Sequence, residues 1–195
     1  MGKLDFVNRA LVMLGGETVA AVNDTDSPNA ASANLLYQPT VDELLAEFPW
    51  KFATRRVQLT QSVTAPPNSI YKYQYALPAN TLRVVNVAVD TGRWEFYRNA
   101  TGDERVLYSD ETVVWADVIV RPTSEEAYPA HFQRALVARL AVALAMPVTR
   151  RVDFYRMYMA LADAEVSRAK SQDWNEQPWP EMDDGNLIAA SRYAV

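Results

Sequence analysis

Residues 41–59 change from a helical to an extended pattern, and this change constrains the fold more than any other feature of the chain. Apolar side chains recur at helical spacing as far as Phe48. Pro49 then favours a helix end there, because a proline disfavours the helical conformation of the preceding residue. After Trp50 the residues alternate as in a half-buried strand, up to Leu59. The chain therefore passes from a helical layer into a sheet, and four residues are predicted to form the packing junction: Phe48, Pro49, Trp50 and Phe52.

The composition is that of an ordinary soluble globular protein. The 195 residues fit one domain, or one domain with a large insertion, and 49% are hydrophobic and 22% charged. No cysteine is present, which excludes disulfides and thiolate metal sites. The net charge of −5 argues against wrapping of nucleic acid, which needs clustered Lys and Arg. Because the sequence shows no uninterrupted apolar run of spanning length and no signal-peptide pattern, we expect a soluble protein without a membrane partner.

Two helices are predicted before the transition. Residues 4–14 carry apolar side chains on one face, and Gly15 and Gly16 stop this helix. The second helix starts with Ser27 as N-cap and Pro28 at the first helical position.

Pro39 leaves two alternatives for the second helix. Either the helix kinks at Pro39 and continues to Phe48, or it ends near Tyr37 and restarts with Thr40 and Glu43 as a capping box. We favour the kinked helix.

Residues 51–121 are predicted to be β structure. Alternating and Val-rich runs indicate strands over residues 70–76, 82–89, 94–98, 106–109 and 112–120. Residues 90–92 resemble a tight hairpin connection, residues 109–111 a turn, and residues 60–69 an exposed loop. Sequential strands with short connections imply an antiparallel sheet or a small barrel.

Two further helices and a tail follow the strands. One helix spans residues 129–146 and is ended by Pro147, and the next is capped by Thr149 and continues to about Lys170. Residues 171–195 lose the periodicity but contain two tryptophans and an acidic patch. Because disordered tails are poor in aromatic residues, we expect this tail to dock, either on its own core or on another subunit.

These patterns together predict an α+β fold. A helical domain with about four helices is expected from residues 1–50 and 122–170. The antiparallel β domain, residues 51–121, is an insertion between the two helical parts, and residues 171–195 form an extended C-terminal tail.

Few residues are suited to catalysis. His131 is the single histidine of the chain, so no Ser-His-Asp or Cys-His arrangement and no transition-metal site is expected. Adjacent acidic residues on turns are typical of solvated surface rather than of a glycosidase pair. We therefore predict that the protein is not an enzyme and uses no cofactor.

Several sequence motifs occur in the same order as in one family of viral proteins. The N-terminal ones are Asn8-Arg9-Ala10-Leu11, Leu14-Gly15, Asp24, Ser27, Ala30, Leu44-Leu45 and Pro49-Trp50-Lys51-Phe52-Ala53. The later ones are Tyr73-Gln74-Tyr75-Ala76-Leu77-Pro78, Leu82-Arg83-Val84, Phe132, Ala135-Leu136, Arg139-Leu140-Ala141, Leu144-Ala145 and Ala162-Asp163-Ala164. On these motifs the chain, from about Leu4 to Lys170, resembles the tail tubular protein A family, the head-to-tail adaptors of short-tailed bacteriophages. Pro39 departs from the smoother second helix expected in that family.

The resemblance implies a structural virion protein. Similar proteins form a dodecameric ring below the portal protein of the capsid, with the helical layer facing the portal and neighbouring subunits and the β part facing the tail nozzle protein. Genomic DNA passes through the central hole without specific binding. The protein would be made in the cytoplasm of the host bacterium and would be located in the virion tail.

Six residues are predicted to form the interface with a subunit or with the portal. They lie in the tail and at the turn between the last two helices: Trp174, Pro178, Trp179, Pro180, Arg150 and Arg151. Two alternatives to the adaptor remain, another head-completion or connector protein of different stoichiometry and a tail-associated peptidoglycan hydrolase.

Overall fold

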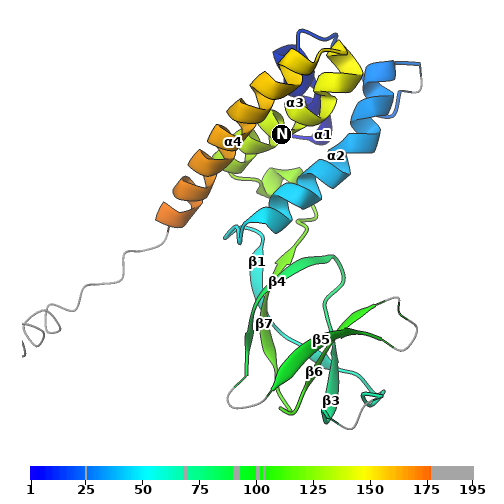
Figure 1. Cartoon of the computed structure of the whole chain (residues 1–195), viewed down its shortest axis with the longest axis vertical. Helices are drawn as coiled ribbons and strands as arrows, with labels where there is room; N and C mark the ends of the chain where they lie inside the picture. Colours follow the sequence, from blue (N-terminus) through cyan, green and yellow to red (C-terminus); the bar gives the residue numbers. More distant parts are fainter. Residues whose placement is uncertain (25, 68–69, 90–92, 100–101, 103, 177–195) are drawn as a thin grey trace, which may run out of the picture.

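The computed structural model describes residues 1–24, 26–67, 70–89, 93–99, 102 and 104–176. Within them the chain has an α+β fold with four α-helices and two antiparallel sheets. Figure 1 shows an elongated molecule with the helices in one half and the strands in the other. The strands follow one another between the second and third helices, and we call the two halves the helical domain and the β domain.

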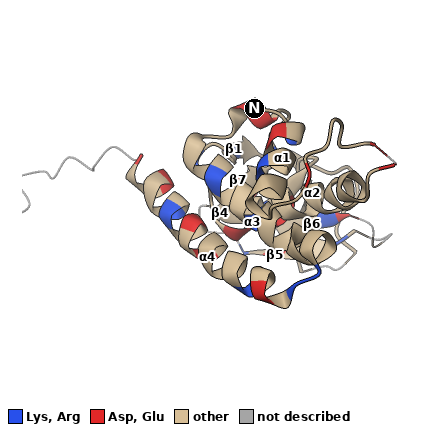
Figure 2. Cartoon of the chain, turned by 90° about the horizontal axis from the view of Figure 1, so that it is seen from above, with Lys and Arg blue, Asp and Glu red and all other residues tan. Residues whose placement is uncertain are grey.

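The helical domain is built around one central helix. Its helices are α1 (Lys3–Met13), α2 (Pro28–Glu47), α3 (Ala130–Thr149) and α4 (Val152–Asn175), with a short 3-10 helix η1 (Glu125–Ala127) before α3. α3 packs against each of the other three helices. α2 and α4 lie on opposite sides of α3, as both Figure 1 and the view from above in Figure 2 show. The helical domain is therefore a layer with α2 and α4 as its two outer helices.

The apolar composition of α3 fits its central position. It is long and apolar enough to span a membrane by length and mean hydropathy, which is 1.3 over its most apolar window. In this fold it is the core helix of the helical domain, with Phe132, Leu136, Leu140 and Leu144 all buried.

The first two helices begin and end largely as their sequences predict. The apolar face of α1 is buried, and Gly15 follows the helix with a φ of 70°, a conformation that favours glycine. The Ser27 hydroxyl accepts a hydrogen bond from the Ala30 amide at 3.3 Å, so Ser27 is the N-cap of α2. The prediction for both helix starts is confirmed.

α2 runs through Pro39 without a break, which confirms the continuous helix. Thr40 does not start a new helix, because its hydroxyl donates a hydrogen bond to the Leu36 carbonyl at 2.8 Å, one turn earlier. Pro39 has no N–H to donate to the carbonyl of Leu35, one turn earlier. Both residues are exposed, so water can bind that carbonyl instead. The helix ends at Glu47, and Phe48 is extended before Pro49 as predicted.

The β domain consists of two sheets that share one apolar core. The first has the strand order β1 (Thr54–Gln58), β7 (Trp115–Val120), β4 (Thr81–Ala88). The second has the order β2 (Thr60–Gln61), β3 (Tyr73–Ala76), β6 (Arg105–Ser109), β5 (Trp94–Arg98). The shared core contains buried side chains from both sheets and their connections: Leu59, Tyr75, Val87, Leu107, Val114, Ala116 and Val118.

Two connections in the β domain differ from the prediction. β4 and β5 belong to different sheets, so no hairpin joins them, and residues 90–92 themselves lie outside the described residues. β6 and β7 are also in different sheets. Changing sheets lets the inner face of each sheet bury against the other, which a single series of hairpins would not do. In addition, the predicted loop over residues 60–69 starts with the short strand β2.

The turn between α3 and α4 is displaced from its predicted place. Pro147 does not end α3, and the helix continues to Thr149. A proline in the last turn removes only one helical hydrogen bond, so the helix can continue past it. α3 ends instead at Thr149, and Arg150 follows as its C-cap with a φ of 55°. α4 then starts after Arg151 as N-cap, and Thr149 accepts a hydrogen bond from the Arg151 amide rather than capping α4.

The C-terminal tail starts later than predicted. α4 extends to Asn175, so residues 171–175 and Trp174 among them are helical rather than extended. The buried residues of α4 recur at spacings of three and four as far as the last turn: Tyr158, Ala162, Val166, Ala169 and Asp173. The stripe was not recognised from sequence because a charged residue occupies its last position.

Candidate interaction surfaces

The predicted packing junction is a cluster of aromatic rings between the two domains. Trp50 is fully buried, and its indole N–H donates a hydrogen bond to the Leu44 carbonyl at 2.8 Å. Its ring makes edge contacts with Phe48 and Phe132 at centroid distances of 5.1 Å each. Phe52 packs on Phe132 at 4.9 Å and on Tyr128 at 5.9 Å. The junction therefore joins the end of α2, the start of α3 and the chain that leads into β1.

Burial in the helical core also raises the pKa of two tyrosine side chains. Tyr128, which precedes α3, is 5% exposed, and burial raises the pKa of its phenol to about 12, with the negative charge of Glu125 as the next cause. Burial likewise raises the pKa of Tyr37 on α2. Both phenols are therefore neutral in the folded protein at neutral pH.

The last turn of α4 is bound to the same junction through Asp173. This side chain is 1% exposed and accepts a hydrogen bond from the Lys51 amide at 3.2 Å. His131 Nε2 lies 3.4 Å from Asp173 Oδ1, and the imidazole stacks on the Trp50 ring with the centroids 6.2 Å apart. The Lys51 ammonium donates to the Trp174 carbonyl at 3.2 Å. The histidine that sequence analysis set aside is thus part of the packing between α3, α4 and the domain junction.

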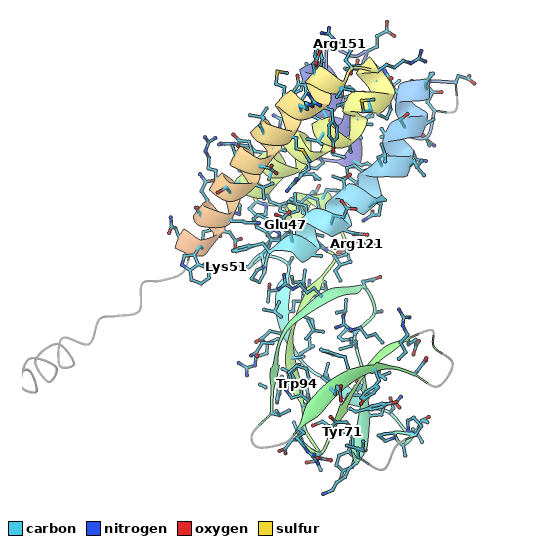
Figure 3. The ribbon with its side chains drawn as sticks, in the orientation of Figure 1. Glu47, Lys51, Tyr71, Trp94, Arg121 and Arg151 are labelled. Carbon is cyan, nitrogen blue, oxygen red and sulfur yellow. The ribbon has the colours of Figure 1, made fainter. Side chains whose placement is uncertain are left out.

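Charged side chains join the helices to each other and to the strands. Arg121, just after β7, donates two hydrogen bonds to the Asp42 carboxylate of α2 at 2.8 and 2.5 Å. Arg83 of β4 donates to the Ala46 carbonyl at 3.1 Å, near the negative end of the α2 dipole. Glu47 pairs with Lys170 at 2.7 Å and with Arg139 at 3.2 Å. Figure 3 places Glu47, Lys51 and Arg121 together where the two domains meet.

A groove of about 880 Å³ lies between α1, α3 and α4. Its apolar lining includes Val12, Val137 and Leu161, and the Val12 side chain is exposed to 62%. Its charged lining includes three arginines and two carboxylates, which gives the lining a net charge of +1: Arg9, Arg134, Arg168, Asp5 and Glu165. Arg168 pairs with Glu165 at 2.6 Å, whereas Arg9 and Arg134 make no ion pair with any residue in the described part of the chain. We call this feature the α1–α3–α4 groove.

The two outer helices expose apolar residues on opposite sides of the helical layer. On α2, Leu35 is 76% exposed and lies on the side of the helix away from the core. On α4, Met157, Ala160 and Ala164 are exposed and lie at helical spacing opposite to the buried stripe. We call these the α2 face and the α4 face. Figure 2 shows that charged residues of both signs also occur along α4.

The structure separates the predicted interface residues into two places. Arg150 and Arg151 lie at the turn between α3 and α4, where Arg151 is 3.8 Å from Asp153 and covers the Phe154 ring. Trp174 lies at the other end of α4 with 62% of its surface exposed. Since α4 has 24 residues, these two places are about 36 Å apart. Pro178, Trp179 and Pro180 lie outside the described residues.

The far end of the β domain carries an aromatic cluster of its own. Tyr97 stacks on Tyr108 with centroids 4.6 Å apart, and Tyr71 packs against both. The Tyr71 and Tyr97 hydroxyls donate to the Glu95 carboxylate at 3.1 and 2.7 Å. Figure 3 shows Tyr71 and Trp94 in the β domain, at the end of the molecule opposite to Arg151.

Sequence reasoning missed the groove and the role of Asp173. Asp173 had a signal in the sequence, because it falls four residues after Ala169 on the buried face of α4. The groove had none, because Arg134 is exposed and looks like an ordinary surface charge. A charged residue at an apolar position indicates either a buried polar partner or a functional surface.

Neither a scan against models of known protein families nor a search of curated proteins found a match for this chain. Among the described residues, no three His, Asp or Glu side chains cluster as the ligands of a metal ion would.

Proposed function

We propose that the protein is a head-to-tail adaptor of a short-tailed bacteriophage. As a structural protein, it would form a ring of twelve copies between the portal and the tail nozzle. The ordered motifs that resemble the tail tubular protein A family support this proposal, and they map mainly to the core and to the junction around Trp50. In this proposal the two sheets act as one small barrel-like unit, and the residues beyond α4 form an extended arm.

One observation carries the argument for a ring. The α2 face has Leu35 and the α4 face has Met157 as exposed large apolar side chains, and α2 and α4 lie on opposite sides of the helical layer. Two different surfaces on opposite sides are what a head-to-tail interface needs, and such an interface closes into a ring when its rotation permits. A two-fold dimer would instead use a single surface that contacts itself.

The junction suits a protein that links two parts of a tail. Buried aromatic rings, the Arg121–Asp42 pair and the bond from the Lys51 amide to Asp173 join the domains through several elements at once. A domain held in this way keeps a fixed direction relative to the helical layer, because each contact restricts a different rotation. The helical layer would then contact the portal and the neighbouring subunits, while the β domain would contact the nozzle.

The predicted interface residues take separate roles in this proposal. Arg150 and Arg151 would contact an acidic surface of a partner at one end of α4. Trp174 and the following Pro178, Trp179 and Pro180 would contact a neighbouring subunit or the portal at the other end. DNA would pass through a lumen that the net charge of −5 keeps from attracting phosphates. Replacing lumen-facing acids with lysine should therefore slow DNA ejection, and an unchanged rate would contradict this part.

Disulfide trapping tests the head-to-tail contact, because the chain contains no cysteine. A chain carrying both Leu35→Cys and Met157→Cys should form a ladder of covalent oligomers on mild oxidation, since each copy joins its α2 face to the α4 face of the next. Each single variant should form no oligomer larger than a dimer. Val63→Cys with Met157→Cys is a matched control, because Val63 is fully exposed but lies in the β domain. A ladder from the control and none from the test pair would contradict the proposed contact.

A further inference from the structure

We propose that the α1–α3–α4 groove is the docking site for residues 177–195 of a second copy of this chain. The inference rests on the proposed ring, because it assigns the contact that an arm from one subunit would make on the next. Its occupant is a defined segment, which follows Glu176 at the end of α4.

The groove and the segment have matching chemistry. The groove combines an apolar lining with an excess of arginines, of which Arg9 and Arg134 have no carboxylate partner among the described residues. The segment contains three acids, Glu181, Asp183 and Asp184, against the single base Arg192. It also contains large apolar side chains on both sides of these acids: Trp179, Met182, Leu187 and Ile188. Acids between apolar anchors suit a groove with arginines around an apolar lining.

The arginines point to an acidic ligand more specifically than the apolar lining does. A single exposed apolar side chain such as Val12 is ordinary on a protein surface. Arg9 and Arg134 are exposed beside the apolar groove, so a carboxylate can approach them, and a guanidinium pairs well with a carboxylate in bidentate geometry. Asp183 and Asp184 would supply two such carboxylates at adjacent positions.

The length of the segment fits a neighbouring copy. Neighbouring helices pack about 8–10 Å apart, so the layer of α2, α3 and α4 is about 30 Å wide. Asp184 is eight residues beyond Glu176 and can be about 26 Å away from it, and the 19 residues together span at most about 63 Å. The acids at the centre of the segment can therefore reach a copy that adjoins α4, but they cannot cross it to reach the next copy. Within its own copy the segment would have to fold back along α4 to reach the groove, because Arg168 on α4 is part of the lining.

Directed disulfide formation between two distinguishable chains tests this inference. One chain carries a size tag and Val12→Cys in the groove, and the other is untagged and carries Met182→Cys in the segment. We expect a disulfide between tagged and untagged chains on mild oxidation. Val63→Cys in place of Val12→Cys is the control, since Val63 is as accessible but lies in the β domain, and it should give no specific product.

Charge reversal then tests the arginines. Arg134→Glu in the tagged chain should lower the disulfide yield about tenfold, which corresponds to about 1.4 kcal/mol. Asp183→Lys with Asp184→Lys in the untagged chain should restore the yield. Equal yields from Val12→Cys and Val63→Cys, or no effect of Arg134→Glu, would overturn the groove as the docking site.

A double variant separates the two possible sources of the segment. One chain then carries both Val12→Cys and Met182→Cys. If this chain forms only an internal disulfide, and the two-chain mixture forms no disulfide between chains, the segment docks in its own copy. The proposal is then wrong. The Leu35–Met157 ladder is independent of this result. A ladder without the Val12–Met182 product would refute the groove and leave the ring, whereas the reverse result would keep the arm and refute the proposed ring contact.

Discussion

At the scale of single residues, Trp50 connects α2, α3 and the chain that leads into β1. It contacts Phe48, Phe132 and His131 and donates a hydrogen bond to the Leu44 carbonyl. The residue therefore contributes both buried apolar area and a satisfied backbone acceptor. Its environment explains why a Pro-Trp pair can end a helix and start the path into a sheet.

Replacing Trp50 by Phe should lower the free energy of unfolding by about 2–3 kcal/mol. The change leaves the Leu44 carbonyl without its buried donor and leaves a space where the second indole ring was. Urea denaturation followed by circular dichroism measures the loss. Trp94→Phe is the matched control, because Trp94 is 40% exposed and should change stability by less than about 0.5 kcal/mol. Equal effects at both positions would mean that the junction is not the stabilising cluster inferred here.

Tyr128 gives the fold a measurable dependence on alkaline pH. Its pKa is raised from about 10 to about 12 in the folded protein, so the unfolded chain loses this proton first as the pH rises. The stability that the neutral phenol provides is fully present below pH 10 and is lost between about pH 10 and pH 12, at up to about 1.4 kcal/mol per pH unit. Between pH 8 and pH 11, the free energy of unfolding should therefore fall less in Tyr128→Phe than in the wild type. Paired urea titrations at the two pH values measure this difference. An identical fall in both proteins would refute the raised pKa.

At the scale of elements, the helix starts and the transition after Phe48 could be predicted because local chemistry determines them. Ser27 and Pro28 set the start of α2, and Pro49 sets the conformation of Phe48. The pairing of the strands could not be predicted, since nothing in residues near 90 or 110 says which sheet the next strand joins. That choice depends on burying two sheet faces against each other, which involves strands distant in sequence.

The end of α4 was missed for a related reason. Asp173 has no obvious place on an apolar helix face, and only the fold brings the Lys51 amide and His131 to it. The groove depends likewise on three helices from both ends of the chain, so its arginines look like ordinary surface charges in the sequence. Partners that are distant in sequence decide both features.

Pro39 allows a direct test of the continuous α2. Pro39→Ala should raise the free energy of unfolding by about 1–2 kcal/mol, because alanine restores the helical N–H and removes the clash with the preceding turn. Thermal and urea unfolding measure the gain. Pro28→Ala is the control, since a proline at the first helical position is favourable, and it should give no gain. A loss of stability in Pro39→Ala would indicate that the helix needs its proline and is interrupted there.

At the scale of the whole molecule, the chain is elongated and has distinct surfaces. The helical layer has two different apolar faces and a groove, and the β domain extends from it through a junction of aromatic rings and ion pairs. Such a subunit can contact neighbours through its helical layer while its β domain stays free for another partner. This arrangement is the physical basis for proposing a ring-forming adaptor.

The mass of the purified chain, alone and mixed with the portal protein of the same phage, tests that proposal most directly. Mass photometry should detect a ring near 260 kDa, the mass of twelve chains of 21.9 kDa, either free or added to the portal. A ring only in the presence of the portal would show that the portal templates assembly. A chain that stays at the mass of one subunit in both samples would contradict the adaptor proposal.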